Sequence, residues 1–519
     1  MSIPQQSTPN NATSKTKAGA TSAADKSPEL STERRTPWWL TLFKPKVGIP
    51  LAILIVLASI PLAIRSWRIS SLPHIDEPFD VEAFCSVTIP DDENAFVEYR
   101  KAFGLFFEFS GTQNDWNSYD ALIRGNCDSA PPPVFVAWLK VNTPAFDVWL
   151  KGTTKPDAMF IPRRDLNYAA IDYTSKARSV VRFAMLRVGR HLHDGNTAEA
   201  WKILHAAFRF SRHVGANGPK LERHTGISML PIVGTGILSW AHHSNTTAED
   251  LEHAIVVLSD EFASMTPPYS ETLKHEYLVE QNFLRSLGPA TRIFTNLPVL
   301  DSGLMFVLGE PEYSEVLFAH LFENQITGID FAPSTRPKLV AGDRRVFDIP
   351  AALGKRISGV ELRNLLTRVS AAKSKGGGAL WMSHSIFALN IEQTVESAML
   401  AVLSVEWYVR KHGWFPSSLG EFPKSLAMGL FADPCHSTSG NIIYRTDDEF
   451  AVFYGLGADG FDDGHSIAPP EGKRQSSWSR LRGSEREWFE GYRIPLWRPP
   501  AEVQTDENNA AGVPDNVQD

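Results

Sequence analysis

The chain has 519 residues, of which 43% are hydrophobic and 21% are charged, and its formal net charge is −8. This balance is typical of a folded protein with two or more domains. The acidic net charge argues against a nucleic-acid-binding surface, which needs clustered basic residues. Three cysteines (Cys85, Cys127 and Cys435) are too few for a disulfide scaffold and lack the spacing of a zinc site. One bridge between Cys85 and Cys127 stays open for a domain in an oxidising compartment.

Both ends of the chain have the composition of disordered tails. Residues 1–36 are rich in Ser, Thr, Asn, Ala and Lys, and residues 499–519 are acidic with few apolar side chains. Neither stretch can bury enough apolar surface to offset the conformational entropy of the chain. We therefore predict a disordered N-terminal tail over 1–36 and a disordered acidic tail over 499–519.

The strongest local signal is the segment 47–64 (VGIPLAILIVLASIPLAI), which contains no charged residue. A helix of about 20 apolar residues crosses the hydrocarbon core of a bilayer, which is ~30 Å thick. Trp38, Trp39 and Trp67 flank the segment, where the interfaces of a membrane would lie. The pattern predicts a transmembrane anchor over 47–64 that binds the lipid bilayer.

Two alternatives to a membrane anchor fit less well. A cleaved signal peptide has a shorter stretch before its apolar run, and Arg65-Ser-Trp67 does not resemble a small-residue cleavage site. A buried core helix seldom lacks polar residues on every face. Four basic residues precede the segment (Arg34, Arg35, Lys44 and Lys46), so the positive-inside rule places the N-terminus in the cytoplasm. We expect a single-pass protein of the inner membrane with most of its chain on the exported side.

Residues 80–385 show the periodicity of amphipathic helices. Apolar residues follow one stripe in 176–194 and again in 199–213, and the turn Asp194-Gly195-Asn196 separates the two. Thr247 and Asp250 have the spacing of a helix cap. Such helical hairpins resemble tetratricopeptide-like stacks, although no 34-residue period is present. The fold class that follows is mainly α, with an α-helical array over 80–385 whose proline-rich part, 291–380, holds short helices and a linker.

From residue 386 onward, the amphipathic helical periodicity gives way to one long helical pattern followed by short apolar runs. A helical pattern from Ile391 to Trp407 ends at Gly413, and short apolar runs follow at 441–444, 450–454 and 492–496. Short apolar runs between turn residues predict strands. We therefore expect a small α+β module over 386–498.

The order of motifs in this module carries a resemblance. Trp407-Tyr408 is followed by His412-Gly-Trp-Phe-Pro416, by Asp433-Pro434 and by Tyr454-Gly-Leu-Gly-Ala-Asp-Gly460. This order, over roughly 390–466, resembles the globular part of the major pseudopilin, protein G, of type II secretion systems. It is also similar to a C-terminal module of planctomycete membrane proteins. The anchor lacks the Gly-Phe-Thr-x-x-x-Glu processing motif, so cleavage and assembly into a pseudopilus are not implied.

In the pseudopilin family the loop after this strand binds calcium, and the resemblance implies the same for Asp459, Asp462 and Asp463. Calcium takes about six to eight oxygen ligands, and glycines let the backbone fold tightly around the ion. The residues alone leave a second interpretation equally open, a Gly/Asp-rich turn with local side-chain bonds and no metal. Gly455-x-Gly457-x-x-Gly460 also fits a phosphate loop, but no helix follows and three acidic side chains would repel a pyrophosphate.

The candidate catalytic motifs lack the residue spacing that their chemistry requires. His275-Glu276 lacks the second histidine of a zincin and is predicted to lie on a solvated helix face. The sequence also contains no Gly-x-Ser-x-Gly elbow. The preferred function is a non-enzymatic scaffold or interaction protein with protein partners in the cell envelope and no nucleic-acid partner. The alternative is an extracytoplasmic hydrolase with its site in the helical domain.

Overall fold

The computed structural model describes the backbone of residues 45–70, 76–112, 114–115, 132–167, 173–286, 306–307, 309, 312–330, 381–422, 442–446, 450–454, 479–482 and 488–495. The chain divides between Ala63 and Ile64 into two compact units. The described residues are mainly helical, as the sequence predicts.

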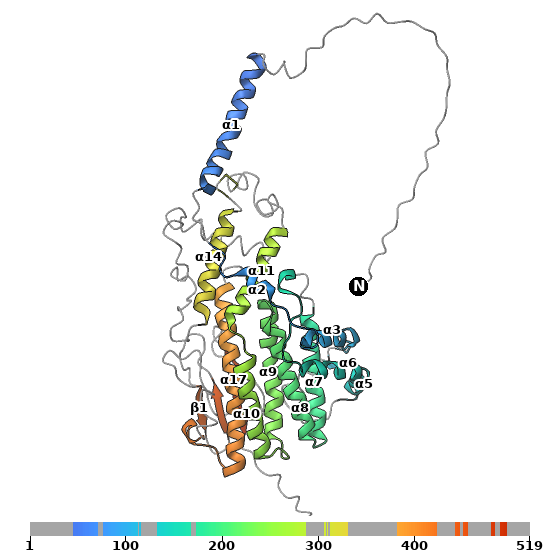
Figure 1. The fold of residues 1–519 in the computed structure, drawn as a ribbon. Helices are drawn as coiled ribbons and strands as arrows, with labels where there is room; N and C mark the ends of the chain where they lie inside the picture. The colour runs from blue at the N-terminus through green and yellow to red at the C-terminus, as the bar shows by residue number, and fades with distance from the viewer. Residues whose placement is uncertain are drawn as a thin grey trace, which may run out of the picture. The chain divides into compact units, whose positions relative to one another are not determined.

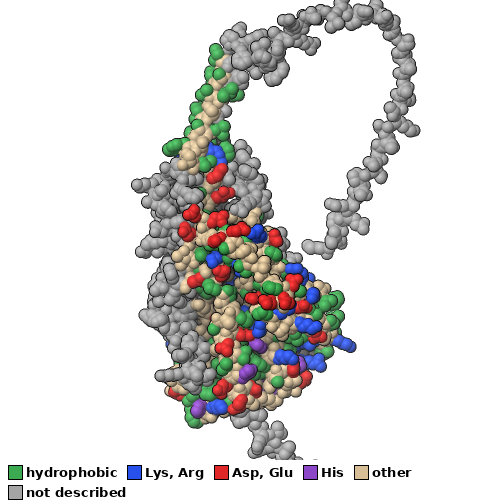
Figure 2. All heavy atoms as spheres, viewed as in Figure 1, with side chains coloured by type: hydrophobic (Ala, Val, Ile, Leu, Met, Phe, Trp, Pro, Cys, Tyr) green, Lys and Arg blue, Asp and Glu red, His purple; other side chains and the backbone are tan. Residues whose placement is uncertain are grey.

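Helix α1 (Pro45–Ser70) contains the predicted anchor. Its stretch Ala52–Ser70, 19 residues long, is apolar enough to cross a membrane by length and composition, and none of it is buried. Ile53, Leu57 and Trp67 expose 54%, 60% and 65% of their surfaces, and Figure 2 shows hydrophobic side chains along the surface of α1. The structure thus has one candidate membrane-spanning helix near the N-terminus within its described residues.

Short helices open the second unit: α2 (Val81–Ser86), α3 (Ala95–Leu105), α5 (Pro133–Val141), α6 (Thr143–Thr153) and the 3-10 turn η2 (Arg163–Asp165). The Asn94 side chain accepts a hydrogen bond from the Phe96 N–H and so caps α3. The Asn94 amide also donates to the Met159 carbonyl at 2.9 Å. One asparagine therefore both starts α3 and ties it to the segment that follows α6.

The main bundle consists of α7 (Thr174–His193), α8 (Thr197–Ala216), α9 (Lys220–His242), α10 (Ala248–Met265) and α17 (Trp381–His412). Figure 1 shows these helices side by side, with α17 packed on both α9 and α10. Gly195 (φ 73°) makes the predicted turn between α7 and α8, in the left-handed region that favours glycine. Thr247 and Asp250 form the predicted cap of α10, with reciprocal side-chain and backbone bonds. Local sequence signals thus set the limits of these helices.

Helices α8 and α9 approach each other closely. A Cβ on Gly226 of α9 would lie 2.4 Å from the Ser211 carbonyl oxygen of α8, so only glycine fits at this crossing. The surrounding core contains the fully buried rings of Trp149, Phe208, Phe210 and Trp240. Close backbone contact and large aromatic side chains together hold the centre of the bundle.

Two further helices, α11 (Tyr269–Ser286) and α14 (Glu312–Ile329), pack against each other. The Tyr277 ring stacks on Phe318 with centroids 5.6 Å apart, and Phe322 meets it edge-on at 5.4 Å. Helix α14 has 18 residues, longer than the short helices predicted for 291–380. The stretch between Pro311 and Pro333 contains no proline, which leaves room for a helix of this length.

The strands form one antiparallel sheet of β1 (Ile443–Thr446), β2 (Phe450–Tyr454), β3 (Ser479–Arg482) and β4 (Trp488–Pro495), in the order β1-β2-β4-β3. The predicted strand at 450–454 is confirmed as β2, and the runs at 441–444 and 492–496 overlap β1 and β4. Helix α17 contacts the sheet through β2 and β4. Gly413 (φ 84°) ends α17, as its sequence predicts.

One hydrophobic cluster joins the helical region and the sheet. It runs from Ala95 in α3 through the bundle and α17 to Phe453 in β2. The predicted boundary at 385/386 therefore lies inside α17, a helix that shares its core with the bundle. The tetratricopeptide-like array and the pseudopilin-like character of the module stay predictions.

Candidate functional site

The predicted calcium ligands Asp459, Asp462 and Asp463 lie outside the described residues, beyond the end of β2. Cys127 and Cys435 also lie outside them, so a Cys85–Cys127 bridge stays a prediction. Within the part of the chain that the structure describes, no group of three or more His, Cys, Asp or Glu side chains is placed to hold a metal ion.

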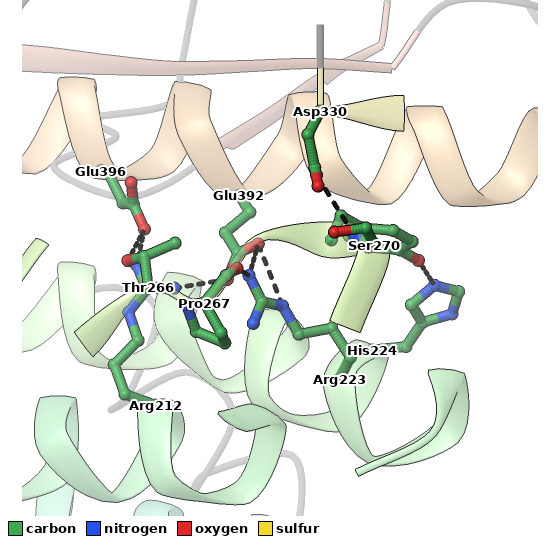
Figure 3. A network of polar contacts seen from close by, with 10 residues as sticks. Arg212, Arg223, His224, Thr266, Pro267, Ser270, Asp330, Glu392 and Glu396 are labelled. Atoms are coloured by element: carbon green, nitrogen blue, oxygen red, sulfur yellow. Dashed lines mark hydrogen bonds and ion pairs between the residues drawn. The ribbon is translucent and has the colours of Figure 1, made fainter. Parts of the chain in front are cut away.

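The most concentrated polar chemistry of the described residues is a buried cluster of four charged side chains, here called the charge cluster: Arg212 of α8, Arg223 of α9, and Glu392 and Glu396 of α17 (Figure 3). The side chains of Arg212, Arg223 and Glu392 expose only 3%, 2% and 2% of their surfaces. Residues about 170 positions apart in sequence thus meet in the interior.

Glu392 lies between the two arginines. One carboxylate oxygen pairs with Arg212, and the other accepts bonds from Arg223, at 2.7 Å from Nη2 and 3.2 Å from Nε. Glu396, one turn further along α17, forms the second ion pair of Arg212. The two carboxylates balance the two guanidinium groups, as buried charges require.

Residues between α10 and α11 complete the surroundings of the charge cluster. The Arg223 guanidinium donates to the Pro267 carbonyl at 3.3 Å, and the Thr266 hydroxyl donates to Glu396 at 3.4 Å. Arg212 also lies over the rings of Phe208 and Phe262, with its guanidinium carbon 5.4 and 5.6 Å from their centroids. Figure 3 also shows His224, Ser270 and Asp330 beside the charge cluster. His224 Nε2 lies 3.1 Å from the Tyr269 hydroxyl oxygen.

The electrostatics of the charge cluster favour a structural role. Burial lowers the pKa of Arg212 to about 10, and the facing Glu392 carboxylate opposes this shift. Arg212 therefore stays charged at neutral pH. An ion pair this deeply buried contributes little net stability, but removal of one partner leaves an uncompensated charge. The charge cluster fixes how α17 docks on α8 and α9.

The C-terminal end of α17 is fixed by Arg410. Its guanidinium donates to the carbonyls of Ala241, His243 and Thr246 at 3.1, 3.0 and 3.2 Å. These carbonyls belong to the last turn of α9 and the loop after it, where a helix leaves acceptors without partners. Burial lowers the pKa of Arg410 to about 10, and Glu406 opposes this shift. Charged contacts thus hold α17 to α9 at its middle and near its C-terminal end.

Two histidines are held by glutamates at partly exposed positions. His205 Nε2 lies 2.8 Å from Glu261, and His242 Nδ1 lies 3.0 Å from Glu406. The His242 side chain is 36% exposed, whereas Glu406 is 1% exposed. A carboxylate that orients an imidazole in this way is also found in proton-transfer sites.

The prediction for His275-Glu276 is wrong. His275 is fully buried and Glu276 is 4% exposed. His275 Nδ1 lies 2.7 Å from the Glu271 carbonyl, and its ring meets Phe84 edge-on at 4.9 Å. Burial lowers the pKa of His275 to about 3, and the nearby Arg163 adds to the shift. The face of α11 that looked solvated in sequence is covered by the segment around α2 and η2.

The sequence did not single out the charge cluster. Arg212 follows the buried Phe208 by one helical turn, and Glu392 precedes the buried Val395 by three residues. Charged residues in an apolar stripe were therefore the available signal. Compared with protein-family models, with curated proteins and with solved structures, the chain matches none.

Proposed function

We propose that this chain is a membrane-anchored scaffold or interaction protein of the cell envelope without enzymatic activity. Residues 47–64 bind the lipid bilayer as a single-pass anchor, with the N-terminus in the cytoplasm. The tetratricopeptide-like helical array (80–385) and the pseudopilin-like module (386–498) then lie on the exported side, where they contact protein partners. The observation that carries the proposal is the uniform exposure of apolar side chains along α1, from Ile53 to Trp67.

The docking of α17 supports a scaffold. Helix α17 is held to α8 and α9 by the charge cluster and to the end of α9 by Arg410, and it packs on β2 and β4. A scaffold must present its binding surfaces in a fixed geometry. The charge cluster at the middle of α17 and the Arg410 hydrogen bonds near its C-terminal end supply that fixed geometry.

The anchor is tested by extraction of the full chain from membranes at alkaline pH. The wild-type chain is expected in the membrane pellet. The double variant Ile53→Arg/Leu57→Arg should move to the soluble fraction, because each central arginine costs about 2.5–3.5 kcal/mol of insertion free energy. Val256→Arg is the matched control, since Val256 is an exposed apolar residue of α10 (50%). A soluble wild-type chain, or a double variant that stays in the pellet, contradicts the anchor.

The topology is tested on cells whose outer membrane has been made permeable while the inner membrane stays intact. Protease added from outside should digest the part after residue 80 and leave a short fragment that contains α1. Full protection of residues 80–519 until the inner membrane is lysed would place them in the cytoplasm and reverse the proposed orientation.

The calcium site is tested by thermal unfolding of the full chain with increasing calcium. An ion that binds only the folded state raises the melting temperature as its concentration rises. The rise should disappear in Asp459→Ala and persist in Asp506→Ala, a control in the acidic tail. Equal responses of the two variants would exclude a calcium site at Asp459, Asp462 and Asp463.

The second candidate function is an extracytoplasmic hydrolase with its site in the helical domain. The pair of His242 and Glu406 favours it, because a partly exposed imidazole is held by a buried carboxylate. Hydrolysis of chromogenic esters, phosphates and glycosides by the wild-type chain would support it if His242→Ala lowered the rate at least tenfold. The exposed His253 provides the control, His253→Ala.

A further inference from the structure

Glu222 is a buried carboxyl group at the start of α9. It is the third residue of the helix and is 3% exposed. Its side chain turns back over the Asn217-Gly218-Pro219 turn between α8 and α9, and Oε2 occupies the space that a Cβ on Gly218 would need. The turn therefore packs directly against the carboxyl group, which fits there because Gly218 has no Cβ.

The buried carboxyl group lies beside a cluster of aromatic side chains. The group that faces it from α7 is the Tyr173 hydroxyl, at the N-terminal end of that helix. The Tyr173 ring is itself packed against Phe96, Phe103 and Phe160, with centroids 4.1 to 5.9 Å apart. Glu222 Oε1 has no hydrogen-bond partner within the described ranges. Burial raises the pKa of Glu222 to about 8, and Tyr173 opposes this shift only in part.

The nearby cations have partners other than Glu222. Arg223, the next residue, binds Glu392 and the Pro267 carbonyl. From α7, Arg178 donates to Thr225 and Ser228 at 3.3 and 3.4 Å. From η2, Arg163 donates to the Asn217 side chain at 2.9 Å and so holds the turn itself. Lys220, two residues before Glu222, is also buried, and its backbone N–H donates to Glu276 of α11 at 3.1 Å. Coulombic attraction from these groups does not contribute to the pKa shift of Glu222.

We propose that Glu222 is a proton-dependent latch on the turn between α8 and α9. The neutral carboxylic acid fits inside the closed turn. When it loses its proton, the charged carboxylate is buried against Tyr173, and burial disfavours the charge, so the side chain moves into water and opens residues 217–223. The proton leaves to solvent, and no other group changes its charge.

The direction of the pH effect follows from linkage. The unfolded carboxyl group loses its proton near pH 4.5, whereas the folded group loses it near pH 8. Between these values the folded state binds more protons than the unfolded state, so the stabilisation by the closed turn decreases as pH rises and is lost through pH 8. The turn is expected to be closed at pH 6 and open at pH 9.

The proposal is tested by amide hydrogen exchange of the full chain at pH 6 and pH 9, with each rate divided by the intrinsic rate at that pH. Residues 217–223 of the wild-type chain should exchange at least tenfold faster at pH 9 than at pH 6, and Glu222→Gln should remove this difference. Glu199→Gln is the matched control, because Glu199 is the third residue of α8 and its side chain is 48% exposed.

Two further outcomes keep the test decisive. Gly218→Ala should open the turn already at pH 6, because its Cβ displaces the carboxyl group. If Glu222→Gln does not fold, the wild-type chain alone decides: faster exchange confined to 217–223, with α10 unchanged, supports the latch. An equal pH response in Glu222→Gln and wild type, or faster exchange over the whole bundle, overturns it.

Discussion

Helices α1 and α9 are both largely apolar and both contain proline, yet the side chains of α1 are exposed and those of α9 are buried. The α1 residues Ile53 and Leu57 are more than half exposed, whereas Val233 and Ile237 of α9 are 0% and 1% exposed. The two helices differ in where they carry polar groups. The apolar run of α1 has no charged residue, but α9 begins with charged residues whose partners lie on other elements. A buried helix in a soluble domain can hold charges because the fold supplies counter-charges, and a helix in lipid cannot.

The largest effect is expected when one charge is placed in each helix at a matched valine. Val233→Lys puts an unpaired ammonium group into the core of the bundle, which costs several kcal/mol and should unfold it. Val56→Lys, at a position 58% exposed, should leave the thermal unfolding of the bundle unchanged and weaken only membrane association. Both variants are compared by circular dichroism in detergent and by membrane extraction. Equal losses of thermal stability would show that α1 and α9 have the same kind of environment.

The next largest effect is expected at Glu392, the buried carboxylate that pairs with Arg223 near the start of α9. Glu392→Gln leaves Arg212 and Arg223 with one carboxylate fewer, and we expect a loss of about 3–5 kcal/mol in the free energy of unfolding. Urea denaturation gives this value directly. The double variant Arg223→Met/Glu392→Met should recover much of the loss, because it removes a buried pair together. A loss below about 1 kcal/mol for Glu392→Gln would mean that the charge cluster is open to water.

A smaller effect is expected where α9 touches α8. Gly226→Ala forces its Cβ against the Ser211 carbonyl, which is backbone and cannot rotate away, so we expect the free energy of unfolding to fall by about 3 kcal/mol. Gly104→Ala in α3 is the control, because a Cβ there meets no atom within 4 Å. The control should gain about 0.5–1 kcal/mol from its better helix propensity. If both variants gain stability, α8 and α9 are further apart than the structure shows.

The sequence predicted the elements of this fold better than their partners. Periodicity located α7 and α8, Gly195 marked the turn between them, and Thr247 with Asp250 marked the start of α10. These signals act within a few residues, where sequence neighbours are also neighbours in space.

The charge cluster could not be predicted in the same way. Arg212 and Glu392 are separated by 180 residues, and nothing local specifies that α17 returns to α8 and α9. His275 shows the same limit, because polar residues on one helix face suggested solvent while α2 and η2 cover that face. For Asp459, Asp462 and Asp463 the prediction rests on the motif order alone.

Lower pH should affect α1 and the bundle differently, because the two differ in their titratable groups. His213 of α8 is buried, its Nδ1 lies 2.7 Å from the Tyr99 hydroxyl oxygen, and burial lowers its pKa from 6.5 to about 3. Its neutral form therefore stabilises the fold fully above pH 6.5, and this stabilisation decreases as pH falls toward 3. At pH 5 the loss from this group is about 2 kcal/mol, at about 1.4 kcal/mol per pH unit.

His213→Gln should flatten this pH dependence of the unfolding free energy between pH 6.5 and 5, whatever its stability at pH 7, and the exposed His253→Gln should leave it unchanged. Membrane association should stay constant over the same range, because residues 47–64 contain no titratable side chain. Parallel loss of folding and of membrane association on acidification would show that the anchor depends on the folded bundle. Loss of folding alone would show that α1 binds the bilayer by its own apolar surface.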